Sequence, residues 1–589
     1  MDVIYYGSNG QLEYDFALRP GADPSAIKLK FHGADDVSVT VQGDLVIKTA
    51  AGDLVQKRPV IYQQDKNGRV SPVTGRYAML QDGAVGVKLD RYDRSLPLVI
   101  DPVLVFSSYL GGKAEDRIQG IKVDSQGKLY IVGYTYTADL VATDDAYSTA
   151  PVQSAVANMF IAVANTTSAG SFSLQYLTYL GGTVNTKPTG MAIDAEGNVY
   201  IAGNTDSADF PMAGASFNTT LPTINGSVFV AKMNPAISGK DSLIYSTFLG
   251  GADTNTANGM AVDSSGKIYV IGTTTSGDFP VTDSAIAGVL WGVSDAFLTK
   301  IDTGSSDLAY STYLGGEDQD EGRAIAVGAN GLVYFAITTY SAQFPMAFSA
   351  GRVTLAGDSD AVVGILDMTK SGGDSLVTSS YFGGSDHDEV RKLALDAQGR
   401  VLLTGFTFSS DFPTTPDAVQ VSGGGNGDAF VSVIDPSRSG NFLVYSTYLS
   451  GGSGDVGYDI AGDASGYIYV TGYTLSYDFP LSADATQIGW GGGADLFVCK
   501  LKPGLAGRNG LIFSTYVGET GTHVPTSMAV GSDGTVYIAG YTTLGMPAVG
   551  ADAKIYNGGT NDGFIVMFSQ LAGQPLKFNR NSVTRAPRY

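Results

Sequence analysis

Short apolar runs bounded by Gly, Asn, Asp or Pro fill most of the chain, and no long apolar pattern with helical period interrupts them. Within one stretch the runs cover four segments: Met191 to Asp194, Val199 to Thr205, Val228 to Asn234 and Leu243 to Phe248. The same four runs recur in the same order along the chain. The pattern predicts an all-β fold built from short strands.

A phrase close to Ser-Thr-Tyr-Leu-Gly-Gly returns seven times and sets the length of the repeat. Its aromatic residue falls at Tyr109, Tyr179, Phe248, Tyr313, Tyr381, Tyr448 and Tyr516, with neighbours 65 to 70 residues apart. This spacing is too long for a helical hairpin repeat. Four strands per repeat are typical of a propeller blade, so we expect seven four-stranded blades of about 68 residues each.

Two further phrases recur within the repeat. An Asp-x-x-Gly turn, as in Asp194 to Gly197, joins the first two strands, and its Asp suits turn capping better than catalysis. After the second strand comes an insertion that usually opens with Asp-Phe-Pro, as at Asp278-Phe279-Pro280. We interpret its Phe as a plug between blades, while a ligand contact is the alternative.

The first and last repeats complement each other. The phrase Ser107 to Gly112 precedes any complete blade, and the last unit ends after its third strand, Gly563 to Ser569. If Val103 to Tyr109 supplies the outer strand of the final blade, a one-plus-three closure completes the ring. The predicted domains are a β-rich domain over 1–101, the propeller over 102–571 and a tail over 572–589.

Charge narrows the set of partners. The formal net charge is -21 and the sequence pI is near 4.4, which opposes binding to nucleic acid. No apolar stretch is long enough for a membrane span, so we expect no membrane insertion, and we expect a monomer. The single cysteine, Cys499, lies in an apolar strand pattern and reads as a buried small side chain.

The recurring phrases resemble the SBBP-type β-propeller repeat family. Its units combine the Tyr-Leu-Gly-Gly phrase, a hairpin of the Asp-x-x-Gly-Asn-Val-Tyr-Val type and a Ser-x-Asp-Phe-Pro loop. The resemblance spans about Val103 to Gln570. Three units depart from Asp-Phe-Pro, with Asp139-Leu140-Val141, Gln343-Phe344-Pro345 and Gly545-Met546-Pro547 in its place.

The leading 100 residues resemble the β-rich domain that precedes such repeats in bacterial surface proteins. The resemblance rests on Tyr5-Tyr6-Gly7, the run from Gln11 to Phe16 and the run from Leu96 to Pro102. In relatives that domain starts well upstream, which implies an amino-terminally shortened chain whose missing signal peptide is uninformative. The resemblance therefore implies an extracellular or cell-surface location and leaves the molecular role open.

Propeller geometry predicts that the Asp-Phe-Pro insertions and the loops after each Gly-Gly emerge on one face. Several of these loops are acidic, and clustered carboxylates are what Ca²⁺ requires. Solvated or turn-capping carboxylates are the alternative, because the spacing lacks a full calcium loop. The candidate calcium ligands are Asp318, Asp320, Glu321, Asp386, Asp388, Glu389 and Asp455; no other cofactor is expected.

The same face carries the candidate ligand contacts. They are Trp291, Trp490, Asp318, Asp320, Asp386 and Asp388. Either Trp could form a binding platform or pack down over its own blade. The histidines His32, His387 and His523 lie far apart in sequence, and no nucleophile, zinc or phosphate motif accompanies them.

Two functions follow from these features. The first is a non-catalytic extracellular binding or scaffold module for protein or glycan contact, including cell-surface adhesion. The second is a hydrolase or lyase acting on a polysaccharide, with carboxylates at the central mouth of the propeller. The missing catalytic motifs favour the first.

Overall fold

The fold is described from a computed structural model of the 589-residue chain. The structure describes residues 2–8, 11–31, 33–40, 45–49, 52–56, 59–64, 70–73, 75–80, 83–96, 98–101, 105–166, 172–347, 351–436, 438, 442–482, 485–546 and 558–568. The segment 572–589, predicted as a tail, lies outside the described residues. None of the described helices is both long and apolar enough to cross a membrane.

The amino-terminal region is a small β-rich unit, as predicted. Its strands are β1 (Asp2–Ser8), β2 (Gln11–Leu18), β3 (Asp36–Val39), β4 (Leu45–Thr49), β5 (Gly52–Gln56), β6 (Val60–Gln64), β7 (Val70–Pro72), β8 (Gly75–Met79), β9 (Val85–Leu89) and β10 (Leu98–Asp101). They form sheets of order β1-β2-β10-β6-β7, β3-β4-β5 and β8-β9, with one 3-10 helix, η1 (Pro24–Ala26).

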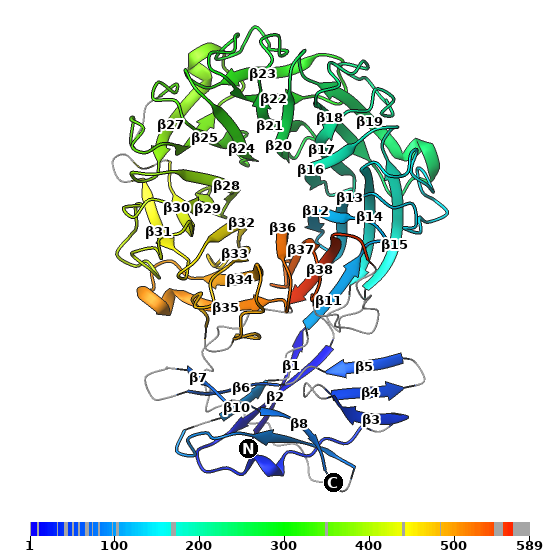
Figure 1. The fold of residues 1–589 in the computed structure, drawn as a ribbon, viewed down its shortest axis with the longest axis vertical. Coiled ribbons are helices and arrows are strands. Elements are labelled where there is room, and N and C mark those ends of the chain that lie inside the picture. Colours follow the sequence, from blue (N-terminus) through cyan, green and yellow to red (C-terminus); the bar gives the residue numbers. More distant parts are fainter. Residues whose placement is uncertain are drawn as a thin grey trace.

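Seven four-stranded antiparallel sheets follow and form a ring (Figure 1). Blade 1 contains β12 (Asp116–Val123), β13 (Lys128–Thr135), β14 (Asn158–Thr166) and β15 (Phe172–Leu180). Blade 2 contains β16 (Thr186–Ile193), β17 (Val199–Thr205), β18 (Ser227–Met233) and β19 (Leu243–Leu249). Blade 3 contains β20 (Asn255–Val262), β21 (Ile268–Thr274), β22 (Asp295–Ile301) and β23 (Leu308–Leu314).

The remaining blades repeat this order from the inner to the outer strand. Blade 4 contains β24 (Asp320–Val327), β25 (Val333–Thr339), β26 (Asp360–Leu366) and β27 (Leu376–Phe382). Blade 5 contains β28 (Asp388–Leu395), β29 (Val401–Thr407), β30 (Asp428–Ile434) and β31 (Leu443–Tyr448). Blade 6 contains β32 (Asp455–Gly462), β33 (Ile468–Thr474), β34 (Asp495–Leu501) and β35 (Leu511–Val517). The 3-10 helices η2 (Gly239–Ser242), η3 (Gly372–Ser375) and η4 (Gly507–Gly510) precede the outer strands of blades 2, 4 and 6.

The last blade joins the two ends of the ring. It contains β36 (His523–Val530), β37 (Val536–Thr542), β38 (Asp562–Phe568) and, as its outer strand, β11 (Val105–Leu110). β11 pairs antiparallel with β38, Val105 opposite Phe568 and Leu110 opposite Gly563. The all-β, seven-bladed fold with one-plus-three closure is confirmed.

The predicted turns explain why the strands end where they do. In the turn after β16, the Oδ1 atom of Asp194 accepts hydrogen bonds from the backbone nitrogens of Glu196 (3.1 Å) and Asn198 (2.9 Å). Gly197 adopts φ 78°, a left-handed conformation that L side chains rarely adopt. The Asp in this turn is therefore a capping residue, as predicted.

One inner strand is longer than the sequence pattern indicates. The pattern places its start at Met191, but β16 begins at Thr186 and contains Pro188. β16 is the edge strand of its sheet, so a residue without a backbone N–H donor is tolerated there. A register shift between Pro188 and Gly190 absorbs the irregularity.

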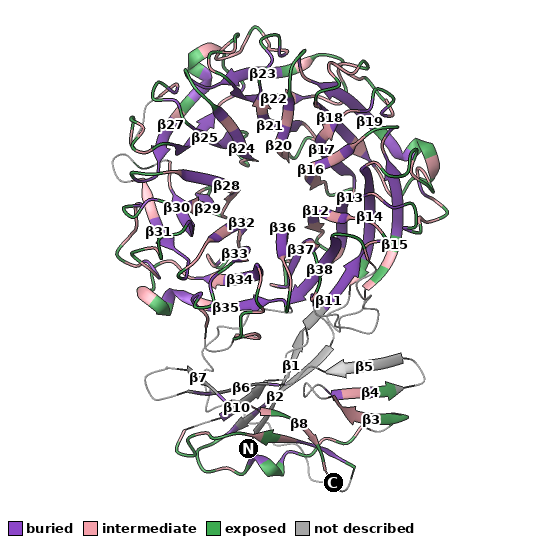
Figure 2. Cartoon of the chain, in the orientation of Figure 1, coloured by how far each residue is buried: buried purple, intermediate pink, exposed green. Residues whose placement is uncertain are grey.

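The hydrophobic core lies between neighbouring blades rather than in one centre. Ile161 of blade 1 and Phe229 of blade 2, both fully buried, belong to one such cluster. Figure 2 shows buried residues along the strands around the whole ring and exposed ones mainly in the loops. Each blade thus needs a neighbour on both sides, which is why the ring must close.

Candidate functional site

One face of the ring carries both kinds of loop that the sequence predicts to be functional. Alternate connections of an antiparallel sheet emerge on opposite faces, so the Gly-Gly loops and the second-to-third-strand loops share a face. Bridges between the two kinds of loop join Ser294 to Gln319 and Ser359 to His387. We call this side the loop face.

Three of the candidate ligands are turned into the protein at this face. Asp320, Asp388 and Asp455 are each buried at the start of an inner strand. The Oδ2 atom of each accepts a hydrogen bond from the backbone nitrogen of the glycine four residues earlier, which is Gly316, Gly384 or Gly451, at 2.7, 2.6 and 2.8 Å. These carboxyls hold the loops in place and do not face a ligand.

Burial raises the pKa of these three carboxyls, to about 6 for Asp320 and Asp388 and about 7 for Asp455. Hydrogen bonds from neighbouring hydroxyls and glycine nitrogens oppose the shift without cancelling it. A fourth residue of this kind, Asp116, has a pKa of about 7 for the same reason. These groups therefore begin to bind protons already near neutral pH, well above the pH at which an exposed Asp does so.

The other acidic candidates remain at the surface or pair with arginines. Asp318 and Asp386 are exposed, and each accepts a hydrogen bond from the backbone nitrogen of the next residue. Glu389 pairs with Arg391 at 2.6 Å and with Arg323 at 3.2 Å, and Glu321 also pairs with Arg323.

The described residues contain no group of three or more His, Cys, Asp or Glu side chains that could hold a metal ion. The acidic residues named as candidate calcium ligands are thus divided between buried loop caps, ion pairs and single exposed carboxylates. Calcium binding stays a prediction from the sequence.

The Asp-Phe-Pro insertions are structural, as the plug interpretation predicts. Phe279 is buried and stacks on Phe297, with ring centroids 4.5 Å apart. Its backbone nitrogen donates to the hydroxyl of Tyr313 (2.9 Å), which itself donates to the carbonyl of Ser276 (2.7 Å). The same arrangement recurs at Tyr381, Tyr448 and Tyr516. The tyrosine of the repeat phrase is thus the anchor of the insertion.

Replacing Tyr313 by Phe should lower the free energy of unfolding by about 1–3 kcal/mol, because the buried N–H of Phe279 and C=O of Ser276 lose their short hydrogen bonds to the hydroxyl and keep only a 3.4 Å bond to each other. Chemical denaturation of the whole chain measures this change. Tyr477→Phe is the matched control, since the Tyr477 side chain is exposed. Equal stability of the two variants would contradict the anchoring role.

The two tryptophans are exposed on the loop face and remain candidate ligand contacts. The exposed fractions are 55% for Trp291 and 39% for Trp490. The backbone below each is fixed, since Asp295 accepts from the nitrogen of Trp291 (2.9 Å) and Asp495 from that of Gly491 (2.6 Å). Each ring is therefore carried on a fixed backbone and is partly open to solvent.

A row of aromatic side chains near the axis of the ring escaped the sequence analysis. The second strand of each blade ends in a threonine, and the residue just before it is aromatic in four blades. These residues are Phe406 in blade 5, Tyr473 in blade 6, Tyr541 in blade 7 and Tyr134 in blade 1. The equivalent residues in blades 2, 3 and 4 are Asn204, Thr273 and Thr338. Only alignment of the repeats reveals this difference, because the rings are far apart in sequence.

Basic side chains lie over these rings. Arg391 lies 5.5 Å from the ring centroids of both Phe406 and Tyr458, and Arg117 lies 4.1 Å from that of Tyr541. Lys187 lies 5.1 Å from the ring of Tyr134 and 5.9 Å from that of Tyr136. We call this set the axial arc: Phe406, Tyr458, Tyr473, Tyr541, Tyr134 and Tyr136 with Arg391, Arg117 and Lys187.

The inner strands carry more accessible basic residues than accessible acidic ones, unlike the chain as a whole. Figure 1 shows these seven strands, all of them described, around the axis. Their half-buried basic residues are Arg117, Lys122, Lys187, Arg323, Arg391 and Lys392, and burial lowers the pKa of Lys122. Among the acidic residues of the same strands only Glu321 is half-exposed. The buried Glu389 pairs with Arg391 and Arg323, and Glu115 pairs with Arg117. The axial surface is therefore less acidic than the chain of net charge -21, with its arginines partly neutralised.

His387 continues the arc toward the loop face. Its ring lies 6.1 Å from that of Tyr340, 5.5 Å from Phe406 and 6.1 Å from Phe408. Its Nδ1 atom is 2.5 Å from the hydroxyl of Ser359, and its Nε2 atom is 3.9 Å from Glu389. Phe408 is 49% exposed, so part of this aromatic group is open to a ligand.

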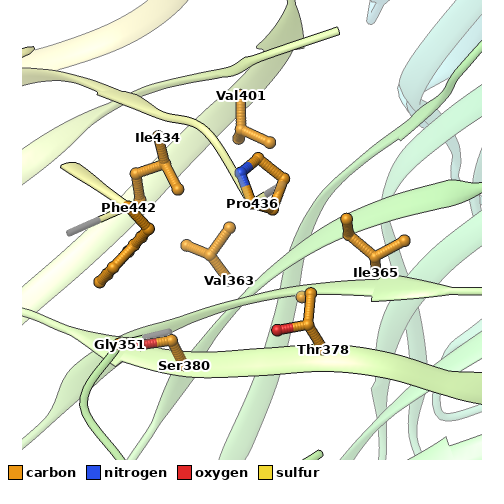
Figure 3. A pocket seen from close by; sticks show the side chains of 10 residues that line it. Gly351, Val363, Ile365, Thr378, Ser380, Val401, Ile434, Pro436 and Phe442 are labelled. Carbon is orange, nitrogen blue, oxygen red and sulfur yellow. The ribbon is translucent and has the colours of Figure 1, made fainter. Parts of the chain in front are cut away.

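An apolar crevice between blades 4 and 5 is too small to be a ligand site (Figure 3). Val363, Ile365, Val401, Ile434 and Phe442 form most of its wall. Its free space is about 20 Å³, which suits about one water molecule. The larger candidate surface is the axial arc.

Two family models match parts of the chain. Residues 1–103 match a domain of unknown function, DUF7948. Residues 175–211, 244–280 and 444–480 match the β-propeller repeat SBBP. Each of these three segments runs from the outer-strand phrase to the Asp-Phe-Pro loop, so the predicted resemblance is confirmed.

The regulatory protein FlaEY of Caulobacter vibrioides is 25% identical to this chain over 404 residues. The aligned part covers 64% of this chain and 38% of that protein, so the chain spans well under half of the relative.

Solved structures give distant likenesses. An ulvan lyase of polysaccharide lyase family PL25 matches with a TM-score of 0.38 and 13% identity, over 76% of this chain and 96% of that one. A protein of unknown function from Dyadobacter fermentans matches with a TM-score of 0.32 and 10% identity, over 79% and 99%. Neither likeness relates individual site residues between the proteins.

Proposed function

We propose that this chain, an SBBP-repeat propeller behind a DUF7948 region, is a non-catalytic binding module that acts outside the bacterial cell or at its surface. Its ligand, a glycan or a protein, contacts the loop face and the adjoining axial arc. The FlaEY relative carries the name of a regulatory protein, and binding without turnover suits that description.

The axial arc carries this proposal. Partly exposed aromatic rings and basic side chains lie together in the axial arc, whereas acidic residues outnumber basic ones in the chain as a whole. Aromatic and Arg side chains are the groups most enriched at binding hot spots. The exposed Trp291 and Trp490 extend the apolar contact area outward on the same face.

A binding screen against glycan and protein arrays tests the proposal. We expect the whole chain to retain at least one ligand, and the double variant Trp291→Ala, Trp490→Ala to bind it about tenfold more weakly or worse. Val377→Ala is the control, since Val377 is an exposed apolar residue of the outer strand β27. Failure to retain any ligand, or equal binding by all three proteins, would contradict it.

A second function, a polysaccharide hydrolase or lyase, is favoured by one observation. His387 lies beside Tyr340 and 3.9 Å from Glu389 at the loop-face end of the axis, so one small region holds groups able to transfer a proton. A turnover screen with polysaccharides decides between the functions. Under this alternative His387→Gln abolishes product formation and leaves binding in place, while Asp318→Asn, Asp386→Asn tests the exposed carboxylates.

A further inference from the structure

We propose that the axial arc binds a short acidic saccharide, whose sugar rings lie on the aromatic side chains and whose acidic groups contact Arg117, Lys187 and Arg391. This inference rests on the proposed binding function and specifies the chemical class of its ligand. The position, exposure and charge of the arc residues support it.

Accessible rings recur along blades 5, 6, 7 and 1, while Tyr134 is buried beneath Tyr136 and Lys187. Arg391 lies 5.5 Å from the ring centroids of both Phe406 and Tyr458, and the ring of Tyr458 is 5.8 Å from that of Tyr473. Tyr458, Tyr473, Tyr541 and Tyr136 are all half-buried, so part of each side chain is open to solvent. The C–H faces of a pyranose are apolar and pack against such rings, as other apolar groups do.

The basic residues supply the complementary charge. Lys187 takes part in no ion pair among the described residues, and Arg117 pairs with Glu115 at 2.7 Å while remaining half-exposed. An arginine can donate two parallel hydrogen bonds to a carboxylate or sulfate. Glu389 already pairs with Arg391. Lys187, which has no ion pair among the described residues, and the accessible part of Arg117 are therefore the cations left to favour an anion at this surface.

The overall charge limits the size of the ligand. A long polyanion would extend from the axis over the acidic loops, where its charges are repelled. At physiological salt, exposed charges more than about 8 Å apart are largely screened, so a short ligand responds mainly to the arc. The same repulsion disfavours single-stranded nucleic acid, although its bases also stack on aromatic rings among basic residues.

The opposite side of the ring provides matched controls. Thr273 occupies in blade 3 the position that Tyr473 occupies in blade 6, and both side chains are half-exposed. Substitutions at the two positions therefore cause a similar local disturbance and differ in whether an aromatic ring is lost.

Calorimetry tests the inference by measuring how four ligands bind to the whole chain. They are hexagalacturonate, its methyl ester, a sulfated glycosaminoglycan hexasaccharide and an eight-nucleotide oligo-dT. We expect either acidic hexasaccharide to bind, the methyl ester to bind at least about tenfold more weakly than its acid, and added salt to weaken binding. Lys187→Gln and Tyr473→Ala should each weaken binding about tenfold, while Thr273→Ala leaves it unchanged. Melting curves of all variants report whether the fold is retained, and Lys187→Gln serves alone if Tyr473→Ala is destabilised.

Other results overturn the inference. Equal affinity for the acid and its methyl ester would show that charge is not recognised, and tighter binding of oligo-dT would assign the arc to nucleic acid. Unchanged binding in both variants would place the ligand elsewhere. If no acidic saccharide binds while the array screen yields another ligand, the inference fails and the binding function stands. If the array screen also yields none, both fail.

Discussion

Lowering the pH from about 8 to about 5 is expected to raise the melting temperature of this chain by several degrees. The reason is a set of buried carboxyls whose pKa is raised in the folded state. The pKa is about 7 for Asp116 and Asp455, and about 6 for Asp320, Asp388 and Asp495.

Burial is the main cause of these raised pKa values, and at four blade junctions a second carboxyl adds to it. Asp562 raises the pKa of Asp116, and Asp428 raises that of Asp455. Asp295 and Asp360 act in the same way on Asp320 and Asp388. Each pair joins the third strand of one blade to the inner strand of the next, where two ionised groups would repel each other.

The direction of the pH effect follows from proton binding. Between about pH 4 and about pH 7 the folded chain holds protons that the unfolded chain has lost, so the free energy of unfolding falls as the pH rises. His523 acts in the opposite sense, because burial lowers its pKa to about 4. Turn residues with lowered pKa values, such as Asp194 and Asp263, lose their contribution only at still lower pH. We therefore expect maximum stability at about pH 5.

The chain itself offers the variant that isolates this effect. In blade 3 the position of Asp455 is taken by Asn255, whose amide oxygen accepts from the nitrogen of Gly251 (3.3 Å). Asp455→Asn should thus keep the loop in place, raise the melting temperature at about pH 8 and flatten its pH dependence. Asp318→Asn removes an exposed charge and controls for net charge.

Differential scanning calorimetry at a series of pH values measures both variants and the parent chain. A melting temperature that falls steadily from about pH 8 to about pH 5, or an unchanged pH dependence in Asp455→Asn, would contradict this explanation.

The architecture could be predicted because every repeat shows the same order of strand and turn patterns. The tyrosine of the phrase recurs in most repeats because its hydroxyl holds the insertion of its own blade, as Tyr313 holds Ser276 and Phe279. The missing outer strand of the last unit and the surplus first phrase then left one way to close the sheet. The start of the strand that contains Pro188 was not predicted, because an edge strand tolerates a proline that would break the hydrogen bonding of a central strand.

The site was harder to predict because neighbouring residues in sequence face different surroundings. Asp318 is exposed while Asp320, two residues later, is buried against Gly316, and both belong to one acidic run. Nothing in the spacing separates the two roles. The axial arc was missed for another reason, since Tyr473 and Tyr134 meet basic side chains contributed by other strands and blades.

Removing residues 1–110 is expected to prevent cooperative folding of the propeller, whereas removing residues 1–101 leaves it folded. The longer deletion takes away β11, which pairs with β38 over its whole length. Tyr109 also packs in the cluster that contains Phe564 and Val566, and its hydroxyl donates to the carbonyl of Met546 (2.8 Å). An unpaired β38 edge and exposed apolar side chains favour aggregation.

Size-exclusion chromatography and thermal unfolding followed by circular dichroism compare the two truncated chains with the full one. We expect the chain from residue 102 to be monodisperse with a melting temperature within a few degrees of the parent, and the chain from residue 111 to aggregate or to melt more than about 10 °C lower. A peptide of residues 103–112 added in excess should restore part of this loss, and the same peptide with Tyr109→Ala should restore less. If the chain from residue 111 folds as stably as the parent, the ring does not depend on β11, because a sheet of three strands then suffices for the seventh blade.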